Sequence, residues 1–337
     1  MKLIKEVLSA NSRAVARAIS LVENNGPGAQ ELMKGIFPRR KDSLILGITG
    51  APGTGKSTLA DQLIGRLRQK NLKVGVVAVD PSSPFTGGAI LGDRIRMMRH
   101  STDTDVFIRS MATRGHLGGL AKAAGDAIAI LEAAGKDVIL VETVGVGQDE
   151  VEVVKLADII LVILTPGSGD DIQAFKAGIM EIADIFVLNK ADQPGIEKLE
   201  IQLKAMLDLG LKDRRRPPIV KTAATEGKGT ERLVREIQAL AAKRESGDLA
   251  ARRRKLLFWM LRDIVREKIF DLLSRRITEA EFSGFVDRIY KKEIDPYTAA
   301  DELIARLRKM PRKDQGEGAG KNVNRKNRPH RNRRSRS

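Results

Sequence analysis

The sequence has no cysteine in its 337 residues, so it can form neither a disulfide nor a thiolate metal site. Histidine is also scarce, and His100, His116 and His330 lie far apart in the chain. No apolar run reaches the roughly 20 residues that a membrane-spanning helix needs. The first residues, MKLIKEVLSANSR, lack the apolar core and the cleavage site of a signal peptide. We therefore expect a soluble, cytoplasmic protein.

Positive charge is concentrated towards the C-terminus. The formal net charge of +17 is typical of nucleic-acid-binding proteins, but ten Lys and Arg residues, against two acids, lie from Pro311 onward. This tail has few apolar residues, and we expect it to be disordered over residues 313–337. A solvated terminus is the simpler interpretation, and contact with RNA, an acidic partner or a membrane surface is the alternative. Outside the tail we expect no nucleic-acid or membrane partner.

Apolar runs alternate with helix-length segments from Ser43 to about Ser246. Near-continuous apolar strands separated by helices predict an α/β fold, with a mostly parallel sheet covered by helices on both faces. The predicted strands are LILGIT, KVGVVAVD, DVFIRS, DVILVE, DIILVILT, DIFVLN and PPIVKT.

Helical extensions flank this α/β region on both sides. The N-terminal segment is predicted to form two short helices, interrupted by NNGPG. The C-terminal segment contains the amphipathic stretch RRRKLLFWMLRDIVREKIFDLL and a last helix that begins at Asp295 and Pro296. Such extensions serve as docking or dimer surfaces or complete the core, and the sequence favours neither. The expected divisions are a helical extension over 1–38, an α/β domain over 39–245, a helical segment over 246–312 and the basic tail over 313–337.

The stretch LGITGAPGTGKSTL contains a complete phosphate-binding loop pattern between a predicted strand and a predicted helix. Glycines let the backbone turn tightly and direct its N–H groups at phosphate oxygens. Lys56 would supply a cation to the terminal phosphates, and the Ser57 hydroxyl would bind Mg²⁺. A chance glycine-rich turn is the weaker alternative, because the expected elements lie on both sides. The predicted phosphate-binding residues are Gly50, Gly53, Thr54, Gly55, Lys56, Ser57 and Thr58.

The polar end of a buried strand, IFVLNKAD, indicates which base is bound. Asn189 can hydrogen-bond the N7/O6 side of guanine, and Asp192 can accept from its N1–H and its exocyclic amine. Adenine lacks those two donors, so it would leave the Asp192 carboxylate partly unpaired. The Lys190 stem can cover the base, and a backbone N–H at Ala223 or Ala224 could meet O6. We predict GTP and GDP as ligands; an ordinary polar loop is the alternative.

Two other predicted strands end in acids, Asp80 and Glu142. The carboxyl ends of parallel strands share one edge of the sheet, so both acids should lie beside the phosphate-binding loop. We predict that they bind Mg²⁺ together with Ser57; capping of a following helix is the alternative. Gly145 could offer its amide to the γ-phosphate.

The stretch DPSSPFTGGAILGDRIRM is rich in proline and glycine and longer than a plain connection requires, which suggests a mobile switch. Asp93 could orient water or metal, and Arg96 could meet a phosphate. A surface ion pair is the alternative. With Lys56 and Glu142 they form the predicted catalytic set, whereas His116 is more often a structural residue.

Taken in order, these motifs resemble those of the MeaB family. The matching stretches are GAPGTGKST, VAVDPSSPFTGGAILGDRIRM, ATRGHLGG, VETVGVGQDE, TPGSGDDIQAFKAGIMEIAD and NKAD, and the resemblance extends over roughly residues 10–310. The family includes the human MMAA protein and proteins formerly called ArgK or arginine/ornithine transport ATPases. The basic tail has no counterpart in it.

The resemblance implies a SIMIBI-class GTPase that chaperones an adenosylcobalamin-dependent acyl-CoA mutase, chiefly methylmalonyl-CoA mutase. Such a protein gates cofactor loading and protects the mutase from inactivation. Family members are commonly homodimers through their C-terminal helices. The resemblance places the predicted phosphate, magnesium and first and second switch roles on Lys56, Ser57, Asp80, Asp93, Arg96 and Glu142. Residues 165–176 match the third switch, which communicates with the mutase, and its predicted residues are Asp170, Asp171, Gln173 and Lys176.

Three other functions are open to a protein with such a phosphate-binding loop. A small-molecule kinase would leave the guanine-reading segment unexplained. A nickel-inserting accessory GTPase belongs to the same class but typically uses Cys and His ligands. A targeting GTPase of the signal-recognition type would carry a methionine-rich RNA-binding domain, and nine scattered methionines do not form one.

Overall fold

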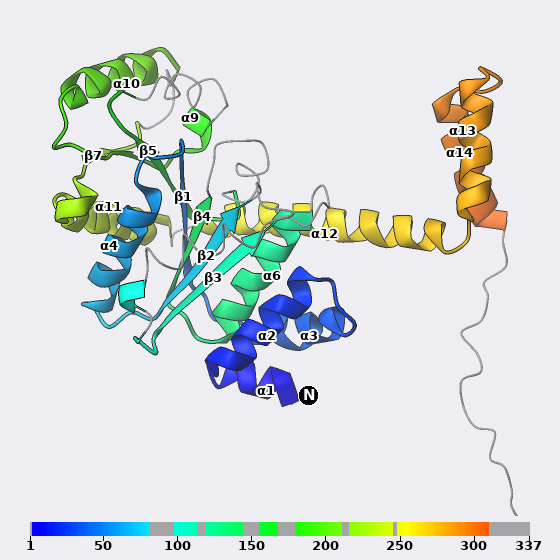
Figure 1. Ribbon diagram of the computed structural model, residues 1–337, viewed down its shortest axis with the longest axis horizontal. Helices are drawn as coiled ribbons and strands as arrows, with labels where there is room; N and C mark the ends of the chain where they lie inside the picture. The colour runs from blue at the N-terminus through cyan, green and yellow to red at the C-terminus, as the bar shows by residue number, and fades with distance from the viewer. Residues whose placement is uncertain are drawn as a thin grey trace, which may run out of the picture. The chain divides into compact units, whose positions relative to one another are not determined.

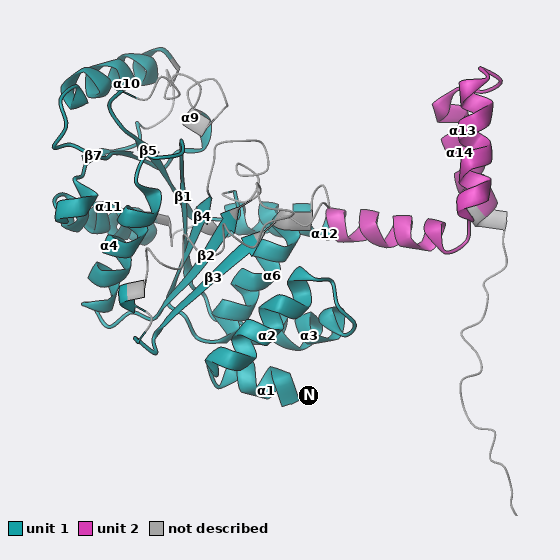
Figure 2. Ribbon diagram, in the orientation of Figure 1, with its two compact units in different colours: residues 1–261 teal, residues 262–337 magenta. Residues whose placement is uncertain are grey.

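The computed structural model describes residues 2–80, 98–100, 102–112, 119–143, 155–167, 179–210, 216–244 and 248–309. The chain divides into two compact units, residues 1–261 and residues 262–337, which are described separately (Figure 2).

A seven-stranded sheet with the order β3-β2-β4-β1-β5-β6-β7 lies at the centre of the first unit (Figure 1). Every pairing is parallel, and all seven predicted strands are present, so the predicted fold class is confirmed. Every residue of β5 is buried, which explains its unbroken apolar sequence, and β4 is equally buried although it ends in Glu142 and Thr143. The strands are β1 (Leu44–Gly50), β2 (Val74–Asp80), β3 (Val106–Ala112), β4 (Val138–Thr143), β5 (Ile159–Leu164), β6 (Ile185–Leu188) and β7 (Ile219–Lys221).

Helices cover both faces of the sheet. Alternate residues of a strand face opposite sides, so Val76 packs with α4 (Lys56–Arg68) and α11 (Thr230–Arg244), whereas Val77 packs with α6 (Gly119–Ala133). The α6 side also holds α10 (Ile196–Gly210). The described part of this unit also contains the short helices η1 (Phe37–Arg39), η2 (Met98–His100), α9 (Ile179–Ile182) and η3 (Ala224–Glu226).

The N-terminal segment forms three α-helices, so the prediction of two was wrong. They are α1 (Lys2–Leu8), α2 (Ser12–Glu23) and α3 (Ala29–Ile36). The additional break arises because Ala10 is left-handed and the Asn11 side chain caps α2 by accepting from the Ala14 N–H. Buried residues of α2, including Ile19, belong to the same apolar cluster as α6, so this extension completes the core.

The C-terminal segment contains α12 (Asp248–Ser274), α13 (Glu279–Tyr290) and α14 (Pro296–Lys309). The helix α13 was not predicted from the sequence. Its start is set by a capping box, in which the Thr278 hydroxyl accepts from the Glu281 N–H and the Glu281 carboxylate accepts from the Thr278 N–H. Phe285 of α13 packs against Leu303 of α14. None of the helices in the described ranges is long and apolar enough to cross a membrane.

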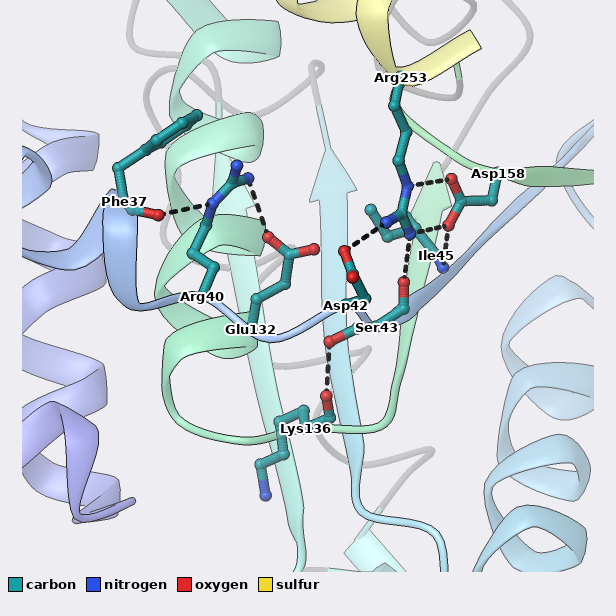
Figure 3. Close-up of polar contacts among 9 residues, drawn as sticks. All are labelled: Phe37, Arg40, Asp42, Ser43, Ile45, Glu132, Lys136, Asp158 and Arg253. Carbon is teal, nitrogen blue, oxygen red and sulfur yellow. Dashed lines mark hydrogen bonds and ion pairs between the residues drawn. The ribbon is translucent and has the colours of Figure 1, made fainter. Parts of the chain in front are cut away.

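The first turns of α12 are fixed to the edge of the sheet where the strands begin (Figure 3). Arg253 binds both carboxylate oxygens of buried Asp158, through Nε at 3.0 Å and Nη2 at 2.8 Å. The same carboxylate accepts from the Ile45 N–H at 2.9 Å, at the start of β1. Arg252 reaches Asp184, beside β6, at 3.0 Å. These contacts join α12 to the beginnings of three strands.

A cavity of about 280 Å³ lies beside this cluster, lined by side chains of η1, α6 and α12. Glu132 forms part of its wall and pairs with Arg40 at 3.0 Å, and the Arg40 guanidinium lies 3.6 Å from the centre of the Phe37 ring (Figure 3). Burial raises the pKa of Glu132, an effect that the charge of Arg40 opposes. Arg40 and Glu132, two of the charged residues around the cavity, therefore bind each other.

Replacing Arg253 with methionine should destabilise the protein, because the buried Asp158 carboxylate would lose its cation. We expect the free energy of unfolding to fall by about 3 kcal/mol, measured by urea denaturation. Arg254→Met is the matched control, because Arg254 is exposed, and it should cost less than about 0.5 kcal/mol. Equal losses in both variants would contradict the role of the Asp158 contact.

Candidate nucleotide site

The candidate site lies at the edge of the sheet where the parallel strands end. Gly50 closes β1, Thr143 closes β4 and Leu188 closes β6. Because these strands are parallel, the segments that follow them emerge on the same side. Residues predicted separately from four parts of the sequence therefore meet here, as the following contacts show.

The phosphate-binding loop joins β1 to α4 and depends on its glycines. Gly50 has a φ of +152°, and a Cβ there would lie 2.4 Å from the carbonyl oxygen of Ile163 on β5. Gly55 has a φ of +86°, and a Cβ there would lie 2.5 Å from the Asn189 side chain. Only glycine fits both positions. The Thr54 hydroxyl closes the turn by donating to the Ala51 carbonyl at 2.8 Å.

Lys56, the first residue of α4, is buried with its ammonium against the loop. Its Nζ donates to the carbonyls of Gly50 at 2.7 Å and Ala51 at 2.9 Å. A buried ammonium requires such acceptors. The positive charge is thereby held next to the loop, whose glycine-rich backbone suits a phosphate group.

Ser57 and Glu142 are in direct contact, although 85 residues separate them: the Ser57 hydroxyl donates to Glu142 Oε1 at 2.5 Å. Glu142 lies on β4 opposite Ile48 of β1, and both members of the contact are buried. A hydroxyl beside a carboxylate offers oxygen ligands from both groups, and such ligands suit a hard divalent cation such as Mg²⁺. The residues present therefore fit the predicted ion. Asp80 ends β2 next to β4, and its side chain lies outside the described residues.

Asn189 connects the phosphate-binding loop to the ends of β6 and β7. Its Nδ2 donates to the Thr54 carbonyl at 2.8 Å, and its Oδ1 accepts from the Thr222 hydroxyl at 3.0 Å and from the Ala224 N–H at 3.2 Å. Thr54 uses one of the two Nδ2 hydrogens, and a base could use the other. The sequence predicted Asn189 as a base contact but did not predict this bridge. Thr222, the residue directly after β7, was also missed as a site residue.

The other predicted guanine contacts surround this bridge. Lys190 has a left-handed backbone conformation and is half-buried, and Asp192 is exposed. A hydrogen bond from Lys228 to Glu226 raises the pKa of Lys228, and the negative charge of Asp192 adds to the effect.

The two predicted backbone donors to guanine O6 already have partners within the protein. The Ala223 N–H donates to the Lys228 carbonyl at 3.1 Å, and the Ala224 N–H donates to Asn189. A contact between either amide and O6 would require one of these bonds to open or to be shared. Their role in reading guanine stays a prediction.

Several predicted residues fall outside the described part of the chain. They are Asp93, Arg96, Gly145, Asp170, Asp171, Gln173 and Lys176, together with the basic tail over 313–337.

A phosphate-binding loop that is joined to strand-end residues on a parallel sheet defines a P-loop nucleotide-binding protein. The family model described as "Methylmalonyl Co-A mutase-associated GTPase MeaB" matches residues 15–278, and the chain therefore belongs to the MeaB family of GTPases.

Relatives match over most of the chain. A protein of Pyrococcus abyssi described as a GTPase is 50% identical, with 91% of this chain and 96% of that protein covered. The GTPase ArgK of Escherichia coli is 34% identical, with 89% and 94% covered. The mouse protein described as "Methylmalonic aciduria type A homolog, mitochondrial" is 32% identical, with 90% and 78% covered.

The fold also has a solved counterpart. The crystal structure described as a "LAO/AO transport system kinase" superimposes with a TM-score of 0.68 at 27% identity, covering 91% of this chain and 97% of that one. The resemblance to MeaB proteins and the P-loop GTPase fold are thus confirmed.

Replacing Asn189 with alanine should weaken GDP binding, because the loop and the strand ends would lose their shared partner. We expect the Kd, measured by calorimetry, to rise roughly 10- to 100-fold. Thr222→Val removes only one hydrogen bond to Asn189 and should cause a smaller rise. Gln193→Ala, an exposed change in the same loop, should leave the Kd unchanged. Unaltered binding in both Asn189→Ala and Thr222→Val would show that the bridge is dispensable.

Proposed function

We propose that this protein is a Mg²⁺-dependent GTPase that chaperones an adenosylcobalamin-dependent acyl-CoA mutase. Methylmalonyl-CoA mutase is the first candidate partner. The observation that carries the proposal is the match of residues 15–278 to the family of mutase-associated GTPases. The name of the mouse relative, which refers to methylmalonic aciduria, agrees with it. In this role the protein would gate cofactor loading and protect the mutase from inactivation.

The arrangement at the strand ends supports phosphate and metal binding in this function. Lys56 and the loop amides would hold the terminal phosphates, and Ser57 and Glu142 would hold Mg²⁺, with Asp80 as a third candidate ligand. The ion would neutralise charge that develops on the phosphate oxygens during hydrolysis. Ser57 and Glu142 now bind each other, so ligation of a cation by both would replace this bond.

A change at Glu142 would reach the next residues directly, because β4 ends at Thr143 and Gly145 follows two positions later. We assign the catalytic roles to Lys56, Asp93, Arg96 and Glu142. The loss of the γ-phosphate would be communicated to the mutase through the segment 165–176, including Asp170, Asp171, Gln173 and Lys176.

An apolar stripe along α12 supports a homodimer. Phe258, Leu261, Val265, Ile269 and Leu272 recur at helical spacing and are between 45% and 64% exposed. Large apolar side chains in such a stripe are typical of a helix that packs against a partner. A second copy of the chain is the proposed partner for this stripe. The cytoplasmic location rests on the sequence alone.

Guanine specificity should depend on Asp192. Wild-type protein is expected to bind GTP at least about 100-fold more tightly than ATP in a calorimetric titration, since adenine lacks both donors to the carboxylate. Asp192→Asn should weaken GDP binding and strengthen binding of xanthosine diphosphate, whose C2 carbonyl accepts from the new amide. Gln193→Ala should leave both affinities unchanged. ATP binding as tight as GTP binding would remove the guanine assignment.

Coupling to the mutase should appear in turnover. We expect slow intrinsic GTP hydrolysis that rises at least about tenfold when methylmalonyl-CoA mutase is added, because the partner would position water and charge around the reacting phosphate. The amount of mutase that co-purifies with the protein should differ between GDP and a non-hydrolysable GTP analogue. Lys56→Ala, which should lose hydrolysis, controls for contaminating GTPases. No complex and no acceleration with any cobalamin-dependent acyl-CoA mutase would refute the chaperone function.

A further inference from the structure

A buried carboxylate, Asp61, lies on α4 one helical turn beyond Ser57. Asp61 is 7% exposed, in a helix whose first residues, Lys56 and Ser57, belong to the candidate site. An ionised carboxylate at such a position needs charged or hydrogen-bonding partners. The identity of those partners indicates what the residue does.

Both partners come from η2, at consecutive positions. Arg99 Nε donates to Asp61 Oδ1 at 2.7 Å, and Arg99 Nη2 pairs with Oδ2, so the guanidinium binds the carboxylate through two nitrogens. His100 Nε2 lies 3.0 Å from Oδ1 and 3.2 Å from the main-chain oxygen of Asp61. A two-point contact with a planar guanidinium determines orientation as well as distance.

The surface of α4 beside Asp61 accommodates the histidine ring. Gly65 lies one turn further along the same face, and a Cβ there would be 3.9 Å from His100 Cε1. The ring therefore sits where the helix presents only a glycine. Together, Asp61 and Gly65 form a docking position on α4 for Arg99 and His100.

This docking position matters because of where η2 lies in the chain. Arg99 follows Arg96 by three residues and Asp93 by six, and both of these are proposed catalytic residues. The contact therefore attaches the chain just beyond them to the helix that carries Lys56 and Ser57. On the other side, β2 ends at Asp80 and is paired with β4, which carries Glu142.

We propose that Asp61 is a positioning residue for GTP hydrolysis. Through Arg99 and His100, it fixes the chain that follows Asp93 and Arg96 relative to Ser57. This inference rests on the proposed GTPase site. A purely structural ion pair would affect stability without a selective effect on turnover, and that difference provides the test.

The experiment compares kcat, KM and GDP affinity in full-length variants. Asp61→Asn and Arg99→Gln should each lower kcat by about 10- to 100-fold while changing the GDP Kd less than about threefold. The double variant should lose no more than either single one, because both break the same contact. Arg99→Lys, which keeps the charge but loses the two-point geometry, should recover only part of the rate.

Asp103→Asn is the matched control. Asp103 pairs with Arg68 at 2.8 Å, so it also joins α4 to the chain after η2, but further from Ser57. The Arg68 hydrogen bond lowers the pKa of Asp103, so this pair is charged at neutral pH. This variant should keep the wild-type kcat. An equal loss of kcat in Asp103→Asn would overturn the specific role of Asp61.

Two outcomes separate this inference from the proposed function. If wild-type protein hydrolyses GTP and both Asp61→Asn and Arg99→Gln keep its kcat, the positioning role is overturned and the GTPase site stands. If the wild type does not hydrolyse GTP, both fail. Should Asp61→Asn not fold, Arg99→Gln decides, because Arg99 is half-exposed and its loss leaves His100 beside the carboxylate.

Discussion

The parallel pairing of β1 with β4 and β5 is the constraint on which the site depends. Gly50 is at once the last residue of β1 and the first of the phosphate-binding loop, and it lies against the Ile163 backbone of β5. On the other side, the register of β1 with β4 brings Glu142 to Ser57. The apolar burial of these strands therefore determines where the polar groups meet, and the polar contacts add precision to an arrangement that the core already sets.

Features of the fold could be predicted from the sequence when the interacting residues lie close together in the chain. The seven strands were predictable because a strand buried on both faces is largely apolar, as in β5 and in β4 up to Val141. The missed helix boundaries had local signals, Asn11 before α2 and the Thr278 capping box before α13. The Asn189–Thr54 contact, in contrast, joins residues 135 positions apart and follows from the order of β1, β5 and β6, which no local pattern specifies.

The residue types of the site were predictable for a related reason. Lys56 and Ser57 complete the phosphate-binding loop pattern that follows β1, and Asn189 is a polar residue directly after the apolar strand β6. What the sequence could not show is that Asn189, predicted as a base contact, also holds the phosphate-binding loop. An amide has four hydrogen-bonding positions, and three of those of Asn189 bind protein groups.

The partners of the buried acids distinguish structural carboxylates from those suited to a ligand. Asp158 and Glu132, at the opposite edge of the sheet, bind arginines that offset their charge. Glu142 instead contacts the Ser57 hydroxyl at the strand-end site, where a hydroxyl and a carboxylate together suit a divalent cation. Asp61 is close to the site but belongs with the first group, because Arg99 and His100 bind it. Its charge is used within the protein, so its effect on turnover has to come from what it holds in place.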